Sequence, residues 1–161
     1  VGAGPFPTEL YDGAGLNDPI GAHLAKEGHE FGATTGRARR CGWLDLVVLR
    51  YAVRINGITE ICLTKLDVLD ELKSIKVCTA YETPDGKCEE FPLDLETFSE
   101  SKPIYDELPG WESDISQLTN FDDLPLNAKN YVKYISNILG VRISLVSVGS
   151  KRNQTIHLLQ H

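Results

Sequence analysis

The feature that most restricts the fold of this chain is an amphipathic helix followed by an apolar strand, a pattern that occurs twice. Apolar residues recur at helical spacing over Trp43–Asn56 and Pro125–Leu139, and a glycine follows each stretch. Apolar segments typical of buried strands come next, at Ile58–Thr64 and Val141–Val146. Alternating helices and strands indicate an α/β fold, so we predict part of a mainly parallel central sheet flanked by helices.

A short polar segment follows each of these strands: Thr64-Lys65-Leu66-Asp67 after the first and Ser147-Val148-Gly149 after the second. Ligands of open α/β sheets bind at the carboxyl ends of strands, so the two loops could hold the two sides of one flat base. The Asp67 carboxylate can accept hydrogen bonds from the N1–H and the exocyclic amine of guanine, whereas adenine lacks that pair of donors. Lys65 can lay its aliphatic stem along a purine face. A surface salt bridge at a strand end is the alternative interpretation.

The remaining elements are less regular. We read Asn17-Asp18-Pro19 as a turn, and Trp111 as a residue of the core or of an interface rather than of a pocket. The other expected elements are a short helix at His23–Gly28, a helix at Val68–Lys76, a β-hairpin around Thr83-Pro84-Asp85-Gly86, a short strand near Ile104 and a last strand at Gln154–Leu159.

A second candidate site is the stretch Gly32–Arg40, where three of the 16 cationic residues fall within four positions of a chain whose net charge is -7. Gly32 and Gly36 allow tight backbone conformations that expose N–H groups. Thr34 and Thr35 add hydroxyl donors, and the arginines add planar forks that suit carboxylate and phosphate. The stretch is interpreted as a loop for a small anionic ligand, or alternatively as a solvated basic turn that leads to a helix.

Composition narrows the class of protein. The 161 residues are about one domain long, and 42% of them are hydrophobic, as in globular proteins. No apolar run approaches the roughly 20 residues that span a bilayer, and the acidic balance argues against nucleic acid or an anionic membrane as a partner. The chain begins at Val1 and contains no methionine. A translated chain needs an initiator, so this one is either processed or a piece of a longer protein, and we favour the piece.

The sequence lacks the motifs of several kinds of catalytic and metal-binding site. The four cysteines form no CxxC pair and are interpreted as buried free thiols of a reducing compartment. The four histidines make no metal pattern, and no GxxxxGK[ST] phosphate loop or Ser-His-Asp constellation is present. We therefore assign no catalytic and no metal-binding residue in this chain.

Five segments together resemble the carboxy-terminal part of the adenylosuccinate synthetase family, in the family's order and over essentially the whole chain. These segments are Val1–Glu9, Glu30–Arg37, Gly42–Asp45, Leu63–Asp70 and Pro109–Trp111. The stretches Asp12–Ala22 and Asp94–Ser101 carry no family signature.

The resemblance implies an activity and its partners. The family joins inosine monophosphate (IMP) to L-aspartate with GTP as co-substrate, and it yields adenylosuccinate, GDP and phosphate. GTP phosphorylates the 6-oxygen of IMP, the aspartate amine displaces that phosphate, and Mg2+ bridges the phosphates. The family works as a cytoplasmic homodimer with an α/β fold around a large central sheet. We therefore expect a P-loop-NTPase-like guanine site, with the hairpin read from the residues as an excursion from the sheet.

The resemblance also implies roles for single residues. Residues 30–40 correspond to the loop that closes on aspartate, in which Thr34 and Thr35 contact the carboxylates, Arg37 neutralises aspartate and reaches towards IMP, and Arg39 also faces GTP. The aspartate-binding residues are then Ala33, Thr34, Thr35, Gly36, Arg37, Ala38 and Arg39. Ala38 departs from the family, in which this position is often basic.

The guanine-binding loops implied by the resemblance are residues 64–67 and 147–149. Their GTP-binding residues are Lys65, Leu66, Asp67, Ser147, Val148 and Gly149, together with Arg39. In the family the phosphate loop, the catalytic aspartate and histidine, the magnesium site and most IMP contacts lie in the amino-terminal half. Residues 1–161 are therefore expected to be a single unit of a longer synthetase and inactive alone. A guanine-nucleotide binding module without catalysis is the alternative.

Overall fold

The computed structural model describes residues 6–10 and 18–158. Contacts between residues divide the chain into two compact units. The first comprises residues 1–47 and 76–106, and the second comprises residues 48–75 and 107–161. Three elements begin in one unit and end in the other: helix α2 (Leu46–Asn56) and strands β3 (Ser74–Thr83) and β5 (Lys102–Pro109).

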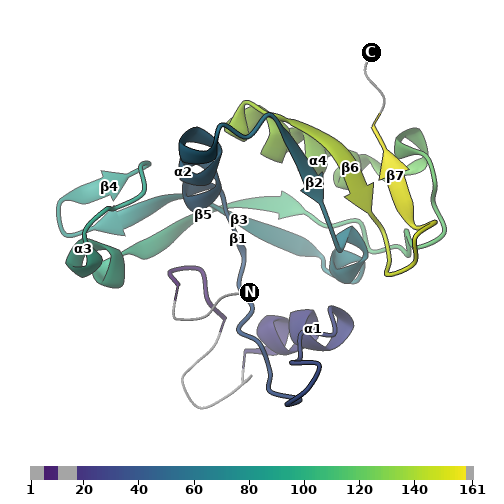
Figure 1. Cartoon of the computed structure of the whole chain (residues 1–161), viewed down its shortest axis with the longest axis horizontal. Coiled ribbons are helices and arrows are strands. Elements are labelled where there is room, and N and C mark those ends of the chain that lie inside the picture. Colours follow the sequence, from purple (N-terminus) through teal and green to yellow (C-terminus); the bar gives the residue numbers. More distant parts are fainter. Residues whose placement is uncertain (1–5, 11–17, 159–161) are drawn as a thin grey trace. The chain divides into compact units, whose positions relative to one another are not determined.

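The first unit is built on a four-stranded sheet in which β3 pairs with strands on both of its edges. Strand β1 (Leu44–Asp45) runs parallel to β3, β4 (Gly86–Cys88) runs antiparallel to it, and β5 also pairs with it (Figure 1). Two helices, α1 (Pro19–Glu27) and α3 (Leu95–Glu100), belong to the same unit.

A small core holds this sheet together. Val47, Cys78 and Tyr81 are buried, and Phe91 and Tyr105 pack against them. The Tyr81 hydroxyl donates to Asp45 Oδ2 at 2.5 Å, which satisfies a polar group that would otherwise be costly to bury. Burial raises the pKa of the Cys78 thiol to about 12, so this cysteine is a protonated core residue and not a nucleophile.

The second unit holds a three-stranded sheet of β2 (Glu60–Leu63), β6 (Arg142–Ser147) and β7 (Thr155–His157). Strand β6 lies between its two neighbours, parallel to β2 and antiparallel to β7 (Figure 1). The helical elements of the unit are α2 from Val48 onward, two short 3-10 helices, η1 (Leu66–Leu69) and η2 (Phe121–Asp123), and α4 (Leu126–Leu139). The fold is thus α/β with mixed sheets, which confirms the predicted class at this level.

The strongest sequence patterns gave elements close to those expected. Helix α4 buries Ala128, Tyr131, Val132, Ile135 and Leu139 on one stripe and ends at Gly140, which has a left-handed φ of 65°. The predicted strands correspond to β2, β6 and β7. The hairpin pairs Thr83 with Gly86 as expected. The cysteines are free as expected, and Cys41 and Cys78 are buried. The expected burial is wrong for Cys62, which is exposed, and Cys88 is only half-buried.

Four local predictions of secondary structure were wrong, and three of them concern where a helix begins. The turn at Asn17-Asp18-Pro19 is a helix start within its described part, because the Asp18 carboxylate accepts from the N–H groups of Ile20 and Gly21 at 2.9 and 2.8 Å. A proline suits the first helical position, so α1 begins at Pro19 rather than at His23. The helix expected from Trp43 begins at Leu46, because Leu44 and Asp45 pair with β3.

The fourth correction concerns residues 68–76, which do not form a helix. The chain makes only the turn η1, bends, and enters β3 at Ser74. The Lys73 carbonyl accepts from the N–H of Gly110 at 2.8 Å, a long-range bond that a helix would replace with an internal one. Leu72 and Ile75 are buried as expected. The apolar residues were therefore identified correctly, but their spacing does not reflect a helix.

Candidate functional site

The two polar loops that follow β2 and β6 lie next to each other. The strands are parallel, and Leu63 pairs with Val146, so their carboxyl ends coincide. At these ends the N–H of Lys65, two residues after β2, donates at 2.9 Å to Oγ of Ser147, the last residue of β6, although the residues are 82 positions apart in sequence. The fold therefore brings the two sequence-predicted base loops together at one sheet edge, where α/β folds bind ligands.

Two of these loop residues, Leu66 and Val148, can offer a ligand only their backbone groups. The side chains of Leu66 and Val148 are buried, with exposed fractions of 1% and 0%. The N–H of Val148 already donates to the Gln154 carbonyl at 2.9 Å. Lys65 has a left-handed φ of 60°, which turns the chain sharply between the strand and η1.

Asp67 provides the acidic group of this edge. Its Oδ1 atom is buried and has no hydrogen-bond partner among the described residues. Burial is the main cause that raises the pKa of this carboxyl; the charge of Asp114 adds to the rise, and that of Lys65 opposes it. A buried carboxylate oxygen without a donor is costly, so a ligand that brings an N–H donor would bind it favourably.

A contact that sequence reasoning missed supports the first loop. The Trp111 indole N–H donates to Asp70 Oδ1 at 2.6 Å, and the N–H of Ile115 donates to Asp70 Oδ2 at 3.0 Å. Burial outweighs these donors and raises the pKa of Asp70 to about 6. Trp111 is buried and packs against Tyr131, so its expected core role is confirmed. Asp70 and Trp111 each lie in one of the five family-like segments, Leu63–Asp70 and Pro109–Trp111. Their joint occurrence there is the sequence signal that could have linked them.

The glycine- and arginine-containing stretch forms a narrow loop in the first unit. Phe31 and Ala38 form an isolated antiparallel bridge. Inside it the N–H of Gly32 donates to the Arg37 carbonyl at 2.8 Å, and the N–H of Gly36 donates to the Gly32 carbonyl at 2.9 Å. Gly36 has a φ of 64°, a conformation that favours glycine. Residues 33–39 are all exposed.

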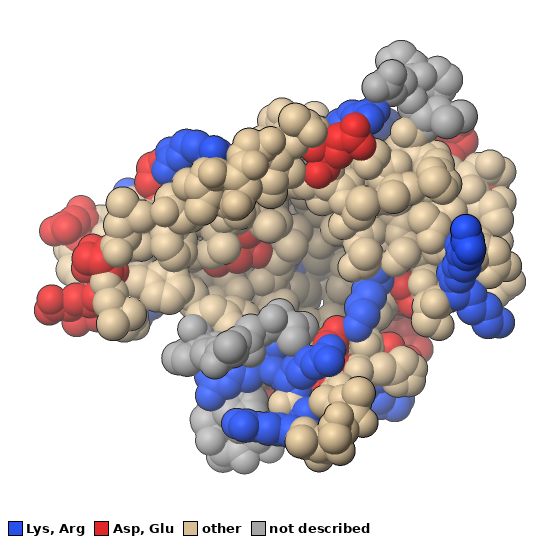
Figure 2. Space-filling model, in the orientation of Figure 1, with Lys and Arg blue, Asp and Glu red and all other residues tan. Residues whose placement is uncertain are grey.

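The three arginines of this loop are held differently. Arg39 pairs with the buried Glu30 at 3.1 Å. Arg40 contacts both carboxylate oxygens of Glu9 at 3.0 Å. The guanidinium of Arg37 has no partner among the described side chains. Figure 2 shows Lys and Arg side chains gathered on the part of the molecule that carries α1 and this loop. The loop thus has two anchored cations and one that remains available for an anion.

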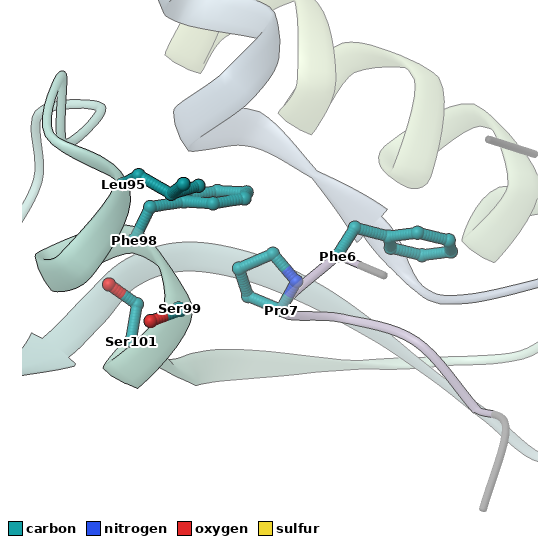
Figure 3. A pocket seen from close by; sticks show the side chains of 6 residues that line it. All are labelled: Phe6, Pro7, Leu95, Phe98, Ser99 and Ser101. Atoms are coloured by element: carbon teal, nitrogen blue, oxygen red, sulfur yellow. The ribbon is translucent and has the colours of Figure 1, made fainter. Parts of the chain in front are cut away.

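The first unit also contains a pocket of about 320 Å³ that sequence reasoning did not predict. Figure 3 shows Leu95 and Phe98 of α3 on one side and Phe6 and Pro7 on the other. Among the described residues that line it, Ser99 and Ser101 supply the polar side chains. None of these described lining residues is charged, so they offer no cation to an anionic ligand.

The described residues contain no group of three His, Cys, Asp or Glu side chains that could hold a metal ion. No helix in the part of the chain described here is long and apolar enough to cross a membrane.

Comparisons with known proteins give one consistent result. The family model described as adenylosuccinate synthetase matches residues 1–156. The adenylosuccinate synthetase of Thermoanaerobacter sp. (strain X514) is 51% identical over 158 residues, which are 98% of this chain and 36% of that protein. The Vibrio vulnificus (strain YJ016) enzyme is 52% identical over 157 residues, which are 97% of this chain and 36% of that protein.

A solved structure agrees with these sequence matches. The structure described as fully ligated adenylosuccinate synthetase from Plasmodium falciparum superposes with a TM-score of 0.89 at 41% identity. The match covers 99% of this chain and 37% of that one. The chain therefore spans only about a third of the length of the relatives that it matches.

Proposed function

The chain belongs to the adenylosuccinate synthetase family, and on that premise we propose that it is the carboxy-terminal portion of an enzyme that joins IMP to L-aspartate. The reaction consumes GTP and yields adenylosuccinate, GDP and phosphate. In this proposal the chain supplies two of the enzyme's binding elements, the guanine loops and the aspartate loop, whereas the reacting phosphates are held by the rest of the polypeptide.

The observation that carries the proposal is the meeting of the two strand-end loops beside an unsatisfied carboxylate. Lys65 donates to Ser147 across the two loops, and Asp67 Oδ1 is buried without a donor among the described residues. Guanine carries two adjacent N–H donors, on N1 and on the exocyclic amine, that match one carboxylate. Adenine has an acceptor at N1, so the same carboxylate would repel it.

Burial of Asp67 has a consequence for binding. It raises the pKa of the free carboxyl, and two N–H donors from guanine favour the ionised form. Binding of the base therefore lowers the pKa of this group and is weakened when Asp67 is protonated. Lys65 would cover a face of the purine with its stem, and Leu66, Val148 and Gly149 would contribute backbone groups.

The loop of residues 30–40 is proposed to bind the aspartate substrate. Thr34 and Thr35 offer hydroxyl donors, and Arg37 offers an exposed guanidinium with no described side-chain partner. Arg37 would neutralise the substrate carboxylates and reach IMP, and Arg39 would exchange part of its contact with Glu30 for GTP. The backbone of Ala33, Gly36 and Ala38 completes the loop.

The remaining parts of the enzyme are assigned outside this chain. Magnesium, which would bridge the phosphates, has no ligand cluster among the described residues, so we assign it to the rest of the polypeptide together with the phosphate loop. The proposed enzyme is a cytoplasmic homodimer. The sheets of this chain then form part of a mainly parallel central sheet with a P-loop-NTPase-like guanine site.

The test is a change of nucleotide preference in the full-length synthetase. Asp67→Asn should lower kcat/KM for GTP by roughly 100- to 10,000-fold, because a site built to bind a donor pair loses one acceptor. The same change should improve the use of xanthosine triphosphate, whose 2-oxygen can accept from the new amide. Asp122→Asn, an exposed change of the same kind, is the matched control. An unchanged preference for GTP would remove Asp67 from the base site.

A further inference from the structure

Gln154 occupies a central position beneath the second of the two strand-end loops. Its backbone accepts from the N–H of Val148 and donates to the Lys151 carbonyl, both at 2.9 Å. Its side-chain Oε1 accepts from the N–H of Lys151 at 2.9 Å. One half-buried residue therefore closes the turn between β6 and β7 with both its main chain and its side chain.

The amide of Gln154 also lies directly against Gly149. A methyl group added to Gly149 would sit 2.3 Å from Cδ and Oε1 of Gln154 and 2.5 Å from its Nε2. Such distances are far below van der Waals contact, so position 149 must be glycine as long as the amide stays where it is. The loop of residues 147–149 thus packs against the Gln154 side chain.

The nitrogen of the same amide contacts the segment that holds the first loop. Nε2 of Gln154 donates to the Ser116 carbonyl at 2.9 Å. The neighbouring N–H of Ile115 donates to Asp70, whose own N–H donates to the Asp67 carbonyl at 3.1 Å. Residues 111–116, here called the bridging segment, therefore link the turn that carries Asp67 to the turn that carries Gly149.

We propose that Gln154 is a positioning residue for the guanine site: through Ser116 and the bridging segment it fixes the loop of residues 147–149 relative to Asp67. This inference rests on the proposed function. A bidentate contact to the base edge and a backbone contact to the other side of the ring require a fixed separation of the two loops. Loss of the Gln154 amide frees one loop while Lys65 and Ser147 still hold the two strand ends, so the base site loosens and the rest of the fold persists.

The first experiment compares Gln154→Met in the full-length synthetase with the wild type and with Gln117→Met. Methionine keeps the length of the side chain and removes both of its hydrogen bonds. Gln117 is exposed, and its side-chain amide donates to the adjacent Ser116 hydroxyl at 3.2 Å and to no other described residue, so it is the matched control. We expect KM for GTP to rise about tenfold in Gln154→Met. The kcat at saturating GTP and the KM values for IMP and aspartate should stay within about twofold.

A second experiment tests the contact with Gly149 by rescue. Gly149→Ala should raise KM for GTP about tenfold when Gln154 is present, because the new methyl group collides with the amide. In a Gln154→Ala background, where the amide is gone, adding Gly149→Ala should raise it less than about threefold. Equal effects in the two backgrounds would contradict the contact and overturn the proposal.

The remaining outcomes separate this inference from the function on which it rests. An unchanged KM for GTP in Gln154→Met overturns the positioning role. A fall in kcat together with a rise in all three KM values would make Gln154 a structural residue and would also overturn the positioning role. A variant that does not fold would have the same meaning. A wild-type enzyme that forms no adenylosuccinate with GTP refutes the proposed function, and the inference falls with it.

Discussion

Replacing Trp111 with phenylalanine isolates the bond that joins the bridging segment to the turn after β2. The substitution keeps an aromatic ring against Tyr131, whose centroid is 6.1 Å from that of Trp111. It removes the indole N–H that lies 2.6 Å from Asp70 Oδ1. Asp70 then keeps one described donor, the N–H of Ile115.

The magnitude follows from the charge on Asp70. A hydrogen bond to a charged group is worth roughly 1.5–3 kcal/mol, and one between neutral groups about 1 kcal/mol. The pKa of Asp70 is about 6 because burial outweighs its two donors, so the group is mostly ionised at pH 8 and mostly protonated at pH 5. We expect Trp111→Phe to lower the free energy of unfolding by about 2 kcal/mol at pH 8 and about 1 kcal/mol at pH 5.

The sign of the pH effect can be checked separately. The pKa of Asp70 is raised in the fold above its ordinary value of 3.8, so the native state binds the proton more tightly than the unfolded state. This group therefore stabilises the wild type as the pH falls from about 7 to about 4. The Trp111 donor opposes that rise in pKa, so its removal raises the pKa further, and the deficit of the variant grows with pH.

Urea unfolding of the 161-residue chain, followed by far-ultraviolet circular dichroism at pH 5 and pH 8, measures both quantities. Trp43→Phe, at the chain's other tryptophan and in the first unit, is the matched control and should show no such pH dependence. A Trp111→Phe deficit that is the same at both pH values would refute the argument, because it would show that Asp70 does not change its charge between them.

Two other predictions concern close packing and activity. Gly110→Ala should lower the free energy of unfolding by more than about 3 kcal/mol, because its methyl group would lie 1.7 Å from the Leu72 carbonyl oxygen. Gly140→Ala, at a φ of 65° in open space, should lower it by only about 1–2 kcal/mol; equal values in urea unfolding would contradict this. The chain alone, incubated with GTP, IMP, aspartate and Mg2+, should form no adenylosuccinate, and any turnover would show that it carries catalytic groups of its own.

Strong periodicity and strand order are what made part of this fold predictable. Helix α4 was expected because its buried stripe runs over 14 residues and ends at Gly140. The meeting of the loops at Lys65 and Ser147 was expected because parallel neighbouring strands place their carboxyl ends together. The local apolar pattern is sufficient to predict the helix, and the parallel direction of the strands is sufficient to predict that the loops meet.

Features that depend on distant partners could not be predicted in the same way. Leu69, Leu72 and Ile75 have spacings that fit a helix, but the carbonyl of Lys73 binds Gly110, which lies in another segment. Asp70 and Trp111 are 41 positions apart, and Gln154 and Ser116 are 38 apart. Nothing in the spacing of these residues marks them as partners, because one hydrogen bond between two loops leaves no periodic trace.

The division of the second unit into residues 48–75 and 107–161 has a consequence for how the protein folds. Strands β2 and β6 are neighbours in the sheet, yet all of the first unit's sheet except β1 lies between them in the chain. Closing so long a loop is entropically costly and slow, and we therefore expect the Lys65–Ser147 contact to form late in folding. Because that cost grows only with the logarithm of loop length, lengthening the β3–β4 turn by a few residues should barely affect the stability of the second unit.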